Sequence, residues 1–405
     1  MAFVSMILDG AEMYLLGIRA LDEAKKVSDL RGLIEASFKY SSKEWIFSSG
    51  FLSHIGHLVY AATLIEMQKN GRLVGGPVKI LAGISYNNYL KSFFSKHTTG
   101  YMPSGTQYAE VISARKRHVT ADGGFCTMSE LVSEAAQFWA AERPFIAVDP
   151  EIRELGDTAL KILGVPPGAP IVTLHVRSPG YSGPIAEMMS LRDARIEDYR
   201  LAVEYLAATG AYVIRLGDQT MTRMTPTDHF IDYPFTKAKS DWMDIYLASR
   251  CRFHIGTSSG MSFVPLLFGR PVLFTNWITL AHMVCSPSVV TLPKRLIGPD
   301  GAVVPMQEYC DRHGHILVRA DATLHDLSFE DNSPEEILDA VQLMGSHIDP
   351  ATGRLTLPGG MFEEQQALFA ASTLGTRPQI PPNFWREHYT ARQTAEGLGL
   401  ARLEH

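Results

Sequence analysis

The chain has 405 residues and a mass of 44.8 kDa, with 46% hydrophobic and 20% charged residues, a globular composition that excludes global disorder. This length is too great for one small core and fits two domains of ordinary size. The formal net charge is -6 and the basic run Arg115–His118 is short and isolated, so we expect no nucleic-acid partner.

The four cysteines are scattered without a CxxC pair, which is typical of reduced thiols in a cytosolic protein and predicts no zinc site. No apolar run reaches the length of a membrane-spanning helix. Asp9 and Glu12 interrupt the apolar character of the first residues, which argues against a signal peptide. We therefore expect a cytoplasmic protein without a membrane span.

The first part of the chain alternates short apolar strands with helical patterns. The expected elements are helices between Gly10 and Tyr40, strands at Trp45–Phe47 and Val78–Ala82, a turn-rich stretch at Thr98–Gln107, and helices at Met128–Ala141 and Pro150–Leu163. Such alternation predicts a parallel sheet with helices on both faces.

The sequence VPPGAP at Val165–Pro170 marks the best domain boundary, and a second alternation follows it. We expect strands at Ile171–Val176, Tyr212–Leu216, Phe230–Asp232, Phe253–Ile255 and Val272–Thr275, and helices at Glu197–Ala208, Asp241–Ser249 and after Gly260. A capping box predicts a helix from Ser333 to Met344, and two more are expected at Phe362–Thr373 and Pro381–Thr390.

These patterns predict the α/β class, with two Rossmann-like doubly wound domains and a C-terminal helical segment. We place the domains at residues 1–165 and 166–345 and the helical segment at residues 346–402. Ligands of such domains bind at the carboxyl ends of the strands, so the expected site is a cleft between the two halves.

A hydroxyl-rich turn lies between an expected strand and an expected helix. Its residues are Gly256, Thr257, Ser258, Ser259 and Gly260. The unpaired N–H groups and the positive dipole end of a helix that begins there favour a phosphate or a carboxylate. The alternative is that the serines only cap the helix.

His175 and Arg177 lie two residues apart at the end of the expected strand Ile171–Val176, so both project to the same face. Arginine suits bidentate contact with a diphosphate and keeps its charge at any relevant pH. The alternative is a structural ion pair for Arg177 and a packed, satisfied His175.

The glycine-punctuated stretch Gly50–Leu58 contains His54 and His57. Glycine lets a backbone approach a ligand closely, and a neutral histidine is suited to act as a general base. We expect His57 at a helix entrance, where the dipole favours the neutral form. The alternative is a plain strand–helix turn with exposed histidines.

Arg215 lies on an otherwise apolar strand that ends at Gly217, and it either pairs structurally or points into the cleft. Nearby, Arg192, Asp193 and Arg195 are typical of a solvated helix start, with a smaller chance of ligand contact. The sequence has no DxD pair, no GxGxxG after a strand and no Walker A motif, so we expect no metal or cofactor.

Four stretches together resemble a family of bacterial glycosyltransferases associated with surface polysaccharide assembly. They are IVTLHVRSPGY, SLRDARIEDYRLAVEYLAATGAYVIRLGD, DWMDIYLASRCRFHIGTSSGMSFVPLLFGRPVLFTNW and FEDNSPEEILDAV. The loop GFLSHIGHL resembles the N-terminal glycine loop of that family, and the resemblance covers most of residues 45–345. HVR followed by IGTSSG is also remotely similar to the fucosyltransferase pattern.

The resemblance implies the two-Rossmann-domain (GT-B) glycosyltransferase type, without a metal. Arg177 and Thr257–Gly260 would then bind the diphosphate of a nucleotide-sugar donor, and His175 would support Arg177 or contact the nucleotide. A base in the N-terminal domain, His57 first and His54 second, would deprotonate a hydroxyl of a glycan, lipid-linked or protein acceptor. Direct displacement at the anomeric carbon would follow.

The sequence departs from the fucosyltransferase pattern just before the strand at Phe253. Positions 250–252 are Arg, Cys and Arg, where those enzymes commonly have an acidic residue that reads the base. This departure argues against a guanine-specific donor. The alternatives to a glycosyltransferase are a sugar-nucleotide epimerase or hydrolase on the same fold and a non-catalytic sugar- or nucleotide-binding protein.

Overall fold

A computed structural model describes residues 147–180, 187–374 and 377–390, together with short stretches before residue 147. The chain divides into two compact units, Met1–Ala135 and Ala136–His405. The domain limits drawn from the sequence, at residues 165 and 345, stay predictions.

The first unit contains a parallel sheet of three strands among its described residues. The strands are β1 (Trp45–Phe47), β2 (Val78–Leu81) and β3 (Thr99–Tyr101), in the order β1-β2-β3. A short antiparallel pair joins β4 (His118–Val119) and β5 (Phe125–Cys126). The strands predicted at Trp45 and Val78 are confirmed, whereas part of the predicted turn-rich stretch is β3, which pairs with β2.

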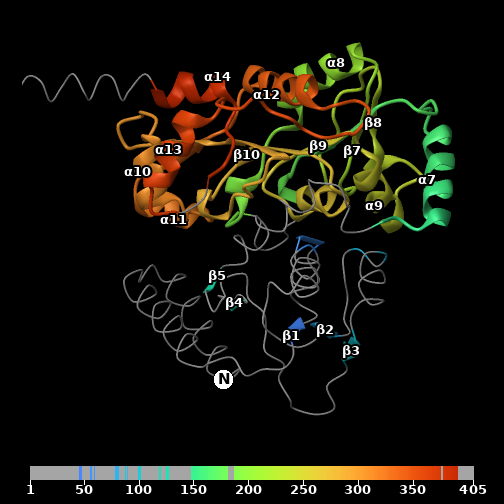
Figure 1. Cartoon of the computed structure of the whole chain (residues 1–405), viewed down its shortest axis with the longest axis horizontal. Helices are drawn as coiled ribbons and strands as arrows, with labels where there is room; N and C mark the ends of the chain where they lie inside the picture. The colour runs from blue at the N-terminus through green and yellow to red at the C-terminus, as the bar shows by residue number, and fades with distance from the viewer. Residues whose placement is uncertain are drawn as a thin grey trace, which may run out of the picture. The chain divides into compact units, whose positions relative to one another are not determined.

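The second unit is built on a six-stranded parallel sheet, which confirms the predicted α/β class (Figure 1). Its strands are β6 (Ile171–His175), β7 (Tyr212–Arg215), β8 (Phe230–Asp232), β9 (Phe253–Gly256), β10 (Val272–Trp277) and β11 (Val289–Pro293). The order β11-β10-β9-β6-β7-β8 reverses direction between β6 and β9. That reversal is the topological switch point of a doubly wound fold, outside which ligands of such sheets bind.

Helices cover both faces of this sheet. On one side α8 (Arg200–Ala208) and α12 (Pro334–His347) pack together, and α12 contacts β10 and β11. On the other side α9 (Asp241–Arg250) packs with the 3₁₀ helix η5 (Gly260–Phe268), and the two contact β6, β9 and β10. Figure 1 shows α8 and α12 on one side of the strands and α9 on the other. Both faces are therefore buried, and β6, β9, β10 and β11 have no exposed residue.

The remaining helices extend this core. They are α7 (Pro150–Ile162), which packs against α9, then η2 (Ser190–Arg192), η3 (Ile196–Tyr199), η4 (Tyr233–Phe235), η6 (Leu280–His282), α10 (Met306–Glu308), the π-helix η7 (Tyr309–His313), α11 (Arg319–Leu324), α13 (Glu363–Ala371), α14 (Pro382–Trp385) and the π-helix η8 (Arg386–Thr390). A two-stranded antiparallel ribbon joins β12 (Arg295–Ile297) and β13 (Ser328–Glu330). The predicted capping box of Ser333 and Glu336 is present at the start of α12.

The C-terminal helices pack on the second unit through aromatic side chains. Phe369 of α13 lies 5.9 Å from Trp385 of α14, centroid to centroid, and Trp385 lies 5.6 Å from Tyr389. All three side chains are buried, so these helices belong to the core of the unit. Among the described residues, no helix combines the length and the apolar character needed to span a bilayer.

Two helical glycines predict opposite effects of the same substitution. Gly156 of α7 lies against the ring of Tyr246 of α9, and a Cβ there would overlap the ring, whereas a Cβ at Gly345 of α12 would meet only the Tyr205 hydroxyl at 4.0 Å. Gly156→Ala should therefore lower the free energy of unfolding by about 1–3 kcal/mol through overpacking. Gly345→Ala, the matched control, should raise it by up to about 1 kcal/mol through helix propensity. Urea unfolding of both variants measures the difference, and equal effects would contradict the close packing of α7 on α9.

Candidate functional site

The carboxyl ends of β6 and β9 bring together three of the residues predicted from the sequence. His175 is paired in register with Gly256. Beyond that pair, the Thr257 N–H donates to the His175 carbonyl (3.1 Å), and the Arg177 N–H donates to the Thr257 hydroxyl (3.0 Å). His175, Arg177 and Thr257 are all buried. The two strand ends are thus joined by hydrogen bonds at the switch point.

Ser258 is fixed at both its side chain and its carbonyl. Its hydroxyl accepts from the N–H of Ile278, which follows β10 (3.1 Å), and its carbonyl accepts from Nε of Arg192 (2.6 Å). A hydroxyl that accepts a backbone N–H keeps its own proton for donation to a third group. Ser258 and Thr257 both have this arrangement, so each keeps a proton for donation. Ser258 is 6% exposed, whereas Thr257 is fully buried.

The rest of the turn is shaped by packing rather than by capping. Ser259 precedes η5, but its side chain makes no capping hydrogen bond. Ser262 instead donates its hydroxyl to the Thr257 carbonyl (2.9 Å). A Cβ at Gly256 would overlap Ser262 and His254, so this glycine permits η5 to lie close to β9. Helix η5 begins at Gly260, the half-buried last residue of the turn.

Arg177 is held by the segment that precedes η3. Its Nη1 donates to the Met189 carbonyl (3.1 Å) and makes an ion pair with Asp193 Oδ1. Burial raises the pKa of Asp193, and the positive charges of Arg177, Lys294 and Arg192 oppose that rise. Arg177 therefore makes the ion pair that the sequence offered as one alternative. It also lies at the carboxyl edge of the sheet, where the other alternative, contact with a diphosphate, was predicted.

His175 is a neutral histidine in this structure. Burial, followed by the charge of Arg215, lowers its pKa from 6.5 to about 3. Its Nδ1 is buried and makes no hydrogen bond among the described residues. A neutral ring at this position is suited to donate or accept a hydrogen bond, but it adds no positive charge toward a phosphate.

Arg215 has no exposed surface. Its Nη1 donates to the Thr222 carbonyl (2.6 Å) and pairs with Asp232 of β8 (3.3 Å). Burial lowers its pKa, against the opposing effect of Asp232. The structural pairing that the sequence offered for Arg215 is thus present, and we leave this residue out of the proposed site. Gly217 follows with a φ of 141°, and a Cβ there would overlap Met221.

The two histidines predicted as the base, His54 and His57, lie outside the described residues, so their role stays a prediction. Positions 250–252, where the sequence departs from the fucosyltransferase pattern, precede β9 and lie at the amino edge of the sheet. There Arg252 donates to the Ile348 carbonyl at the end of α12 (3.0 Å). That contact is structural and lies at the edge opposite the site.

Sequence reasoning missed the polar groups at the ends of β10 and β11. Asn276 exchanges hydrogen bonds with Asn332, 2.6 Å and 2.7 Å long, and Lys294 pairs with Asp331 (2.6 Å). Asn276 has a left-handed φ of 48° and Thr279 one of 63°, which is uncommon for residues other than glycine. The one available signal was the polar Asn276 near the end of the apolar strand β10.

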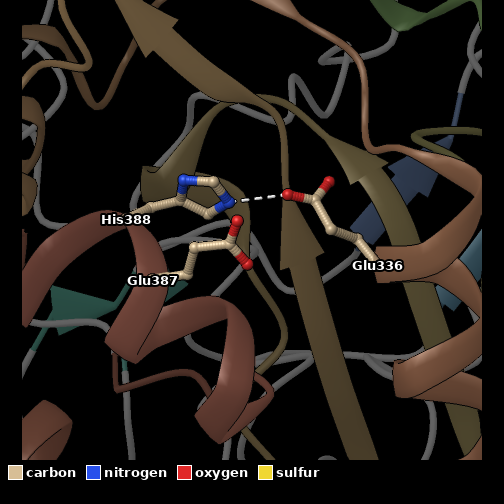
Figure 2. A group of neighbouring side chains, drawn as sticks. All are labelled: Glu336, Glu387 and His388. Atoms are coloured by element: carbon tan, nitrogen blue, oxygen red, sulfur yellow. Dashed lines mark hydrogen bonds and ion pairs between the residues drawn. The ribbon is translucent and has the colours of Figure 1, made fainter.

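A second cluster of polar side chains, at the start of α12, contains residue types that can bind a metal. The ligand atoms of Glu336, Glu387 and His388 all lie within 4.8 Å of one another, and Figure 2 shows His388 Nε2 directed at Glu336 Oε1 (2.6 Å). Arg295 Nη1, however, makes an ion pair with the same Glu336 oxygen, and Glu336 Oε2 accepts from the Ser333 N–H (2.7 Å). The Glu336 carboxylate is thus satisfied by an arginine, a histidine and a helix cap, so we assign no metal here.

A pocket lies at the amino edge of the sheet, where β6 begins. Asp157, Lys161 and Arg250 contribute its charged lining. It lies at the amino ends of the strands, whereas the candidate site lies at their carboxyl ends. It contains none of the predicted site residues. The carboxyl edge therefore remains the candidate functional site.

Comparisons with known proteins give only distant likenesses. No protein-family model and no curated protein sequence matches the chain. A family 9 glycosyl transferase from Veillonella parvula is 10% identical, with a TM-score of 0.36, and the match covers 63% of this chain and 87% of that one. The E. coli ADP-heptose lipopolysaccharide heptosyltransferase II is 11% identical, with a TM-score of 0.35 and coverage of 64% and 92%. The E. coli heptosyltransferase WaaC with ADP is 10% identical, with a TM-score of 0.32 and coverage of 62% and 93%. At these values the likeness decides neither fold nor function, and the fucosyltransferase resemblance stays a prediction from the sequence.

The neutral His175 predicts how stability depends on pH. Its pKa is about 3 in the folded protein and 6.5 in the unfolded chain, so below pH 6.5 the unfolded chain binds a proton that the folded protein does not. The stabilising contribution is complete above pH 6.5 and is lost as the pH falls toward 3, at up to about 1.4 kcal/mol per pH unit. His175→Gln should reduce the slope of the unfolding free energy against pH between 6.5 and 4. His325→Gln, the same change at an exposed position, is the control, and an unchanged slope in His175→Gln would contradict the buried neutral state.

Proposed function

We propose that the protein is a glycosyltransferase that uses a nucleotide-sugar donor, and that the carboxyl edge of the large sheet holds the donor's diphosphate. The observation that carries the proposal is the pair of hydroxyls, Thr257 and Ser258, at the switch point between β6 and β9. Each accepts a backbone N–H and keeps its proton for donation. Two arginines, Arg177 and Arg192, lie beside them.

The proposed mechanism is direct displacement at the anomeric carbon. The acceptor hydroxyl attacks, the bond to the nucleoside diphosphate breaks, and the leaving diphosphate gains negative charge. Thr257 and Ser258 would stabilise that charge with preorganised hydrogen bonds, and Arg177 would stabilise it with its guanidinium. We propose that this device takes the place of a metal, that the two units form a GT-B arrangement, and that His57 or His54 is the base.

Two other functions use the same edge. A sugar-nucleotide epimerase or hydrolase would consume the donor without an acceptor, and a binding protein would hold it without turnover. The preorganised hydroxyls favour an enzyme, because fixed donors that need no rearrangement stabilise a charge that develops during reaction. Assaying nucleotide-sugar consumption with and without glycan acceptors separates the three.

Nucleotide binding tests the proposed site. A ligand that binds the folded state raises its stability by mass action, so at least one of UDP, GDP, CMP, dTDP and ADP should raise the melting temperature. Ser258→Ala should weaken that binding about tenfold, the effect of losing one hydrogen bond to a charged group. Ser288→Ala is the matched control, because Ser258 and Ser288 are each 6% exposed but Ser288 precedes β11 at the opposite edge. No shift with any nucleotide would refute the donor site.

Turnover tests the role of Arg177. Arg177→Ala should abolish the release of nucleotide from the donor. Because that change leaves the buried Asp193 without its partner, it should also cost roughly 3 kcal/mol of stability. Arg177→Lys keeps the charge but not the planar fork, and it should retain the fold with turnover reduced at least tenfold. Near-normal turnover in both variants would remove Arg177 from the mechanism.

A further inference from the structure

The segment Met188–Ala194, here called the strap, crosses the carboxyl ends of the central strands. The Ala194 N–H donates to the Arg177 carbonyl after β6 (3.1 Å). Arg192 Nε donates to the Ser258 carbonyl after β9 (2.6 Å). The strap is therefore hydrogen-bonded to both sides of the switch point, directly at the edge where we place the donor's phosphates.

Asp193 contacts this edge through both its backbone and its side chain. Its carbonyl accepts from Nζ of Lys294, after β11 (2.8 Å), and its Oδ1 makes the ion pair with Arg177 Nη1. The same Nη1 donates to the Met189 carbonyl, which also belongs to the strap (3.1 Å). The strap thus occupies this nitrogen of the arginine with a carboxylate and a carbonyl oxygen.

The carboxylate of Asp193 is only half satisfied. Its Oδ2 is buried and makes no hydrogen bond among the described residues. An ionised carboxylate accepts at both oxygens when its surroundings allow, and a buried oxygen without a donor is destabilised. Burial accordingly raises the pKa of this carboxyl. The ion pair with Arg177 therefore holds the Asp193 carboxylate where one of its two oxygens has no hydrogen-bond donor.

Asp331, the other carboxylate of this network, differs in that respect. It pairs with Lys294 (2.6 Å), and its side chain is 35% exposed, against 12% for Asp193. The side chain of Asp331 is therefore accessible to solvent, whereas protein groups surround most of Asp193. An anion that reaches Arg177 would compete with Asp193 and leave the Lys294 pair in place.

We propose that Asp193 is an internal competitor for Arg177. Its carboxylate occupies the guanidinium until a phosphate-bearing ligand, a nucleoside diphosphate under the proposed function, takes its place. The exchange replaces one charge-assisted hydrogen bond by another and breaks no covalent bond. Asp193 therefore lowers the affinity of the site for phosphate ligands, and the strap responds to their binding. This inference rests on the proposed function, because it requires an anion at the carboxyl edge.

The test compares Asp193→Asn with Asp331→Asn in the full chain. Each change removes one negative charge from the same network, but only the first removes the competitor from Arg177. Calorimetric titration with inorganic pyrophosphate and with the five nucleotides should give about tenfold tighter binding to Asp193→Asn, the effect of one displaced charge-assisted hydrogen bond. Asp331→Asn should bind within about twofold of the wild type, because that charge is exposed and screened.

Thermal melting curves test the same competition for Arg177 without measuring a binding affinity. Asp193→Asn should melt below the wild type in the absence of anion, because the ion pair between Arg177 and position 193 is lost, and should gain more than the wild type when pyrophosphate is added. Asp193→Ala serves as a second variant, since it removes both the carboxylate and any acceptor oxygen at position 193. Binding to Asp193→Asn and Asp193→Ala that is equal to or weaker than wild type, or a gain matched by Asp331→Asn, would overturn the inference alone. The absence of binding by any probe to any of the proteins would overturn the proposed function as well.

Discussion

The hydrogen bond from the Arg177 N–H to the Thr257 hydroxyl joins residues 80 positions apart, and the candidate site depends on it. It continues the parallel pairing of β6 with β9 past the last strand residues, His175 and Gly256. A parallel pair brings equivalent strand ends to one edge of the sheet. The strand order of the sheet reverses between β6 and β9, so the connections that leave these two strands lead to opposite faces of the sheet. Thr257 and Ser258 lie where these connections separate.

Three cations near this edge are each paired with a carboxylate of the protein. Arg177 pairs with Asp193, Lys294 with Asp331, and Arg215 with Asp232. Buried cations without partners would be costly, so each is accompanied by a carboxylate. The consequence for the proposed function is that neutral donors carry much of the recognition. The hydroxyls of Thr257 and Ser258 and the ring of His175 offer hydrogen bonds without adding net charge, and a phosphate must share or replace a carboxylate to reach an arginine.

Much of the second unit could be predicted from the sequence, because its strands are short apolar runs separated by amphipathic helices and turn residues. The predicted strand Phe230–Asp232 coincides with β8, and the other predicted strands from Ile171 onward differ from theirs by two residues or fewer. The helix expected from Glu197 begins instead as η3 at Ile196 and becomes α8 at Arg200. Helix η5 is a 3₁₀ helix that contains Pro265, which lacks the N–H that a regular α-helix needs at that position.

The site was only partly predictable, because its contacts depend on pairs that the sequence does not place together. A strand-end arginine is recognisable, but the sequence alone left open whether Arg177 pairs with another residue, and Asp193 lies 16 positions away in a segment that looked solvated. For Arg215 the sequence left open a structural pair or a place in the cleft, and the structure shows the pair, with Asp232 on the adjacent strand. Sequence patterns predict on which face of a strand a residue lies and where the strand ends. Which residue pairs with a charged side chain is decided by tertiary packing.

The orientation of Ser258 is set from outside its own loop. Its hydroxyl accepts from the Ile278 N–H, which lies two residues beyond the left-handed Asn276. That backbone conformation costs roughly 1 kcal/mol for a residue other than glycine, and the reciprocal hydrogen bonds with Asn332, together with the bond from Asn276 Nδ2 to the Tyr199 hydroxyl (3.1 Å), hold it in place. These partners are buried, so the turn after β10 has little freedom to relax. A strained turn that is held by a buried network beside the hydroxyl that we propose binds the ligand is the arrangement expected where a site is preorganised. The loop before α12 thereby influences the candidate site without lining it.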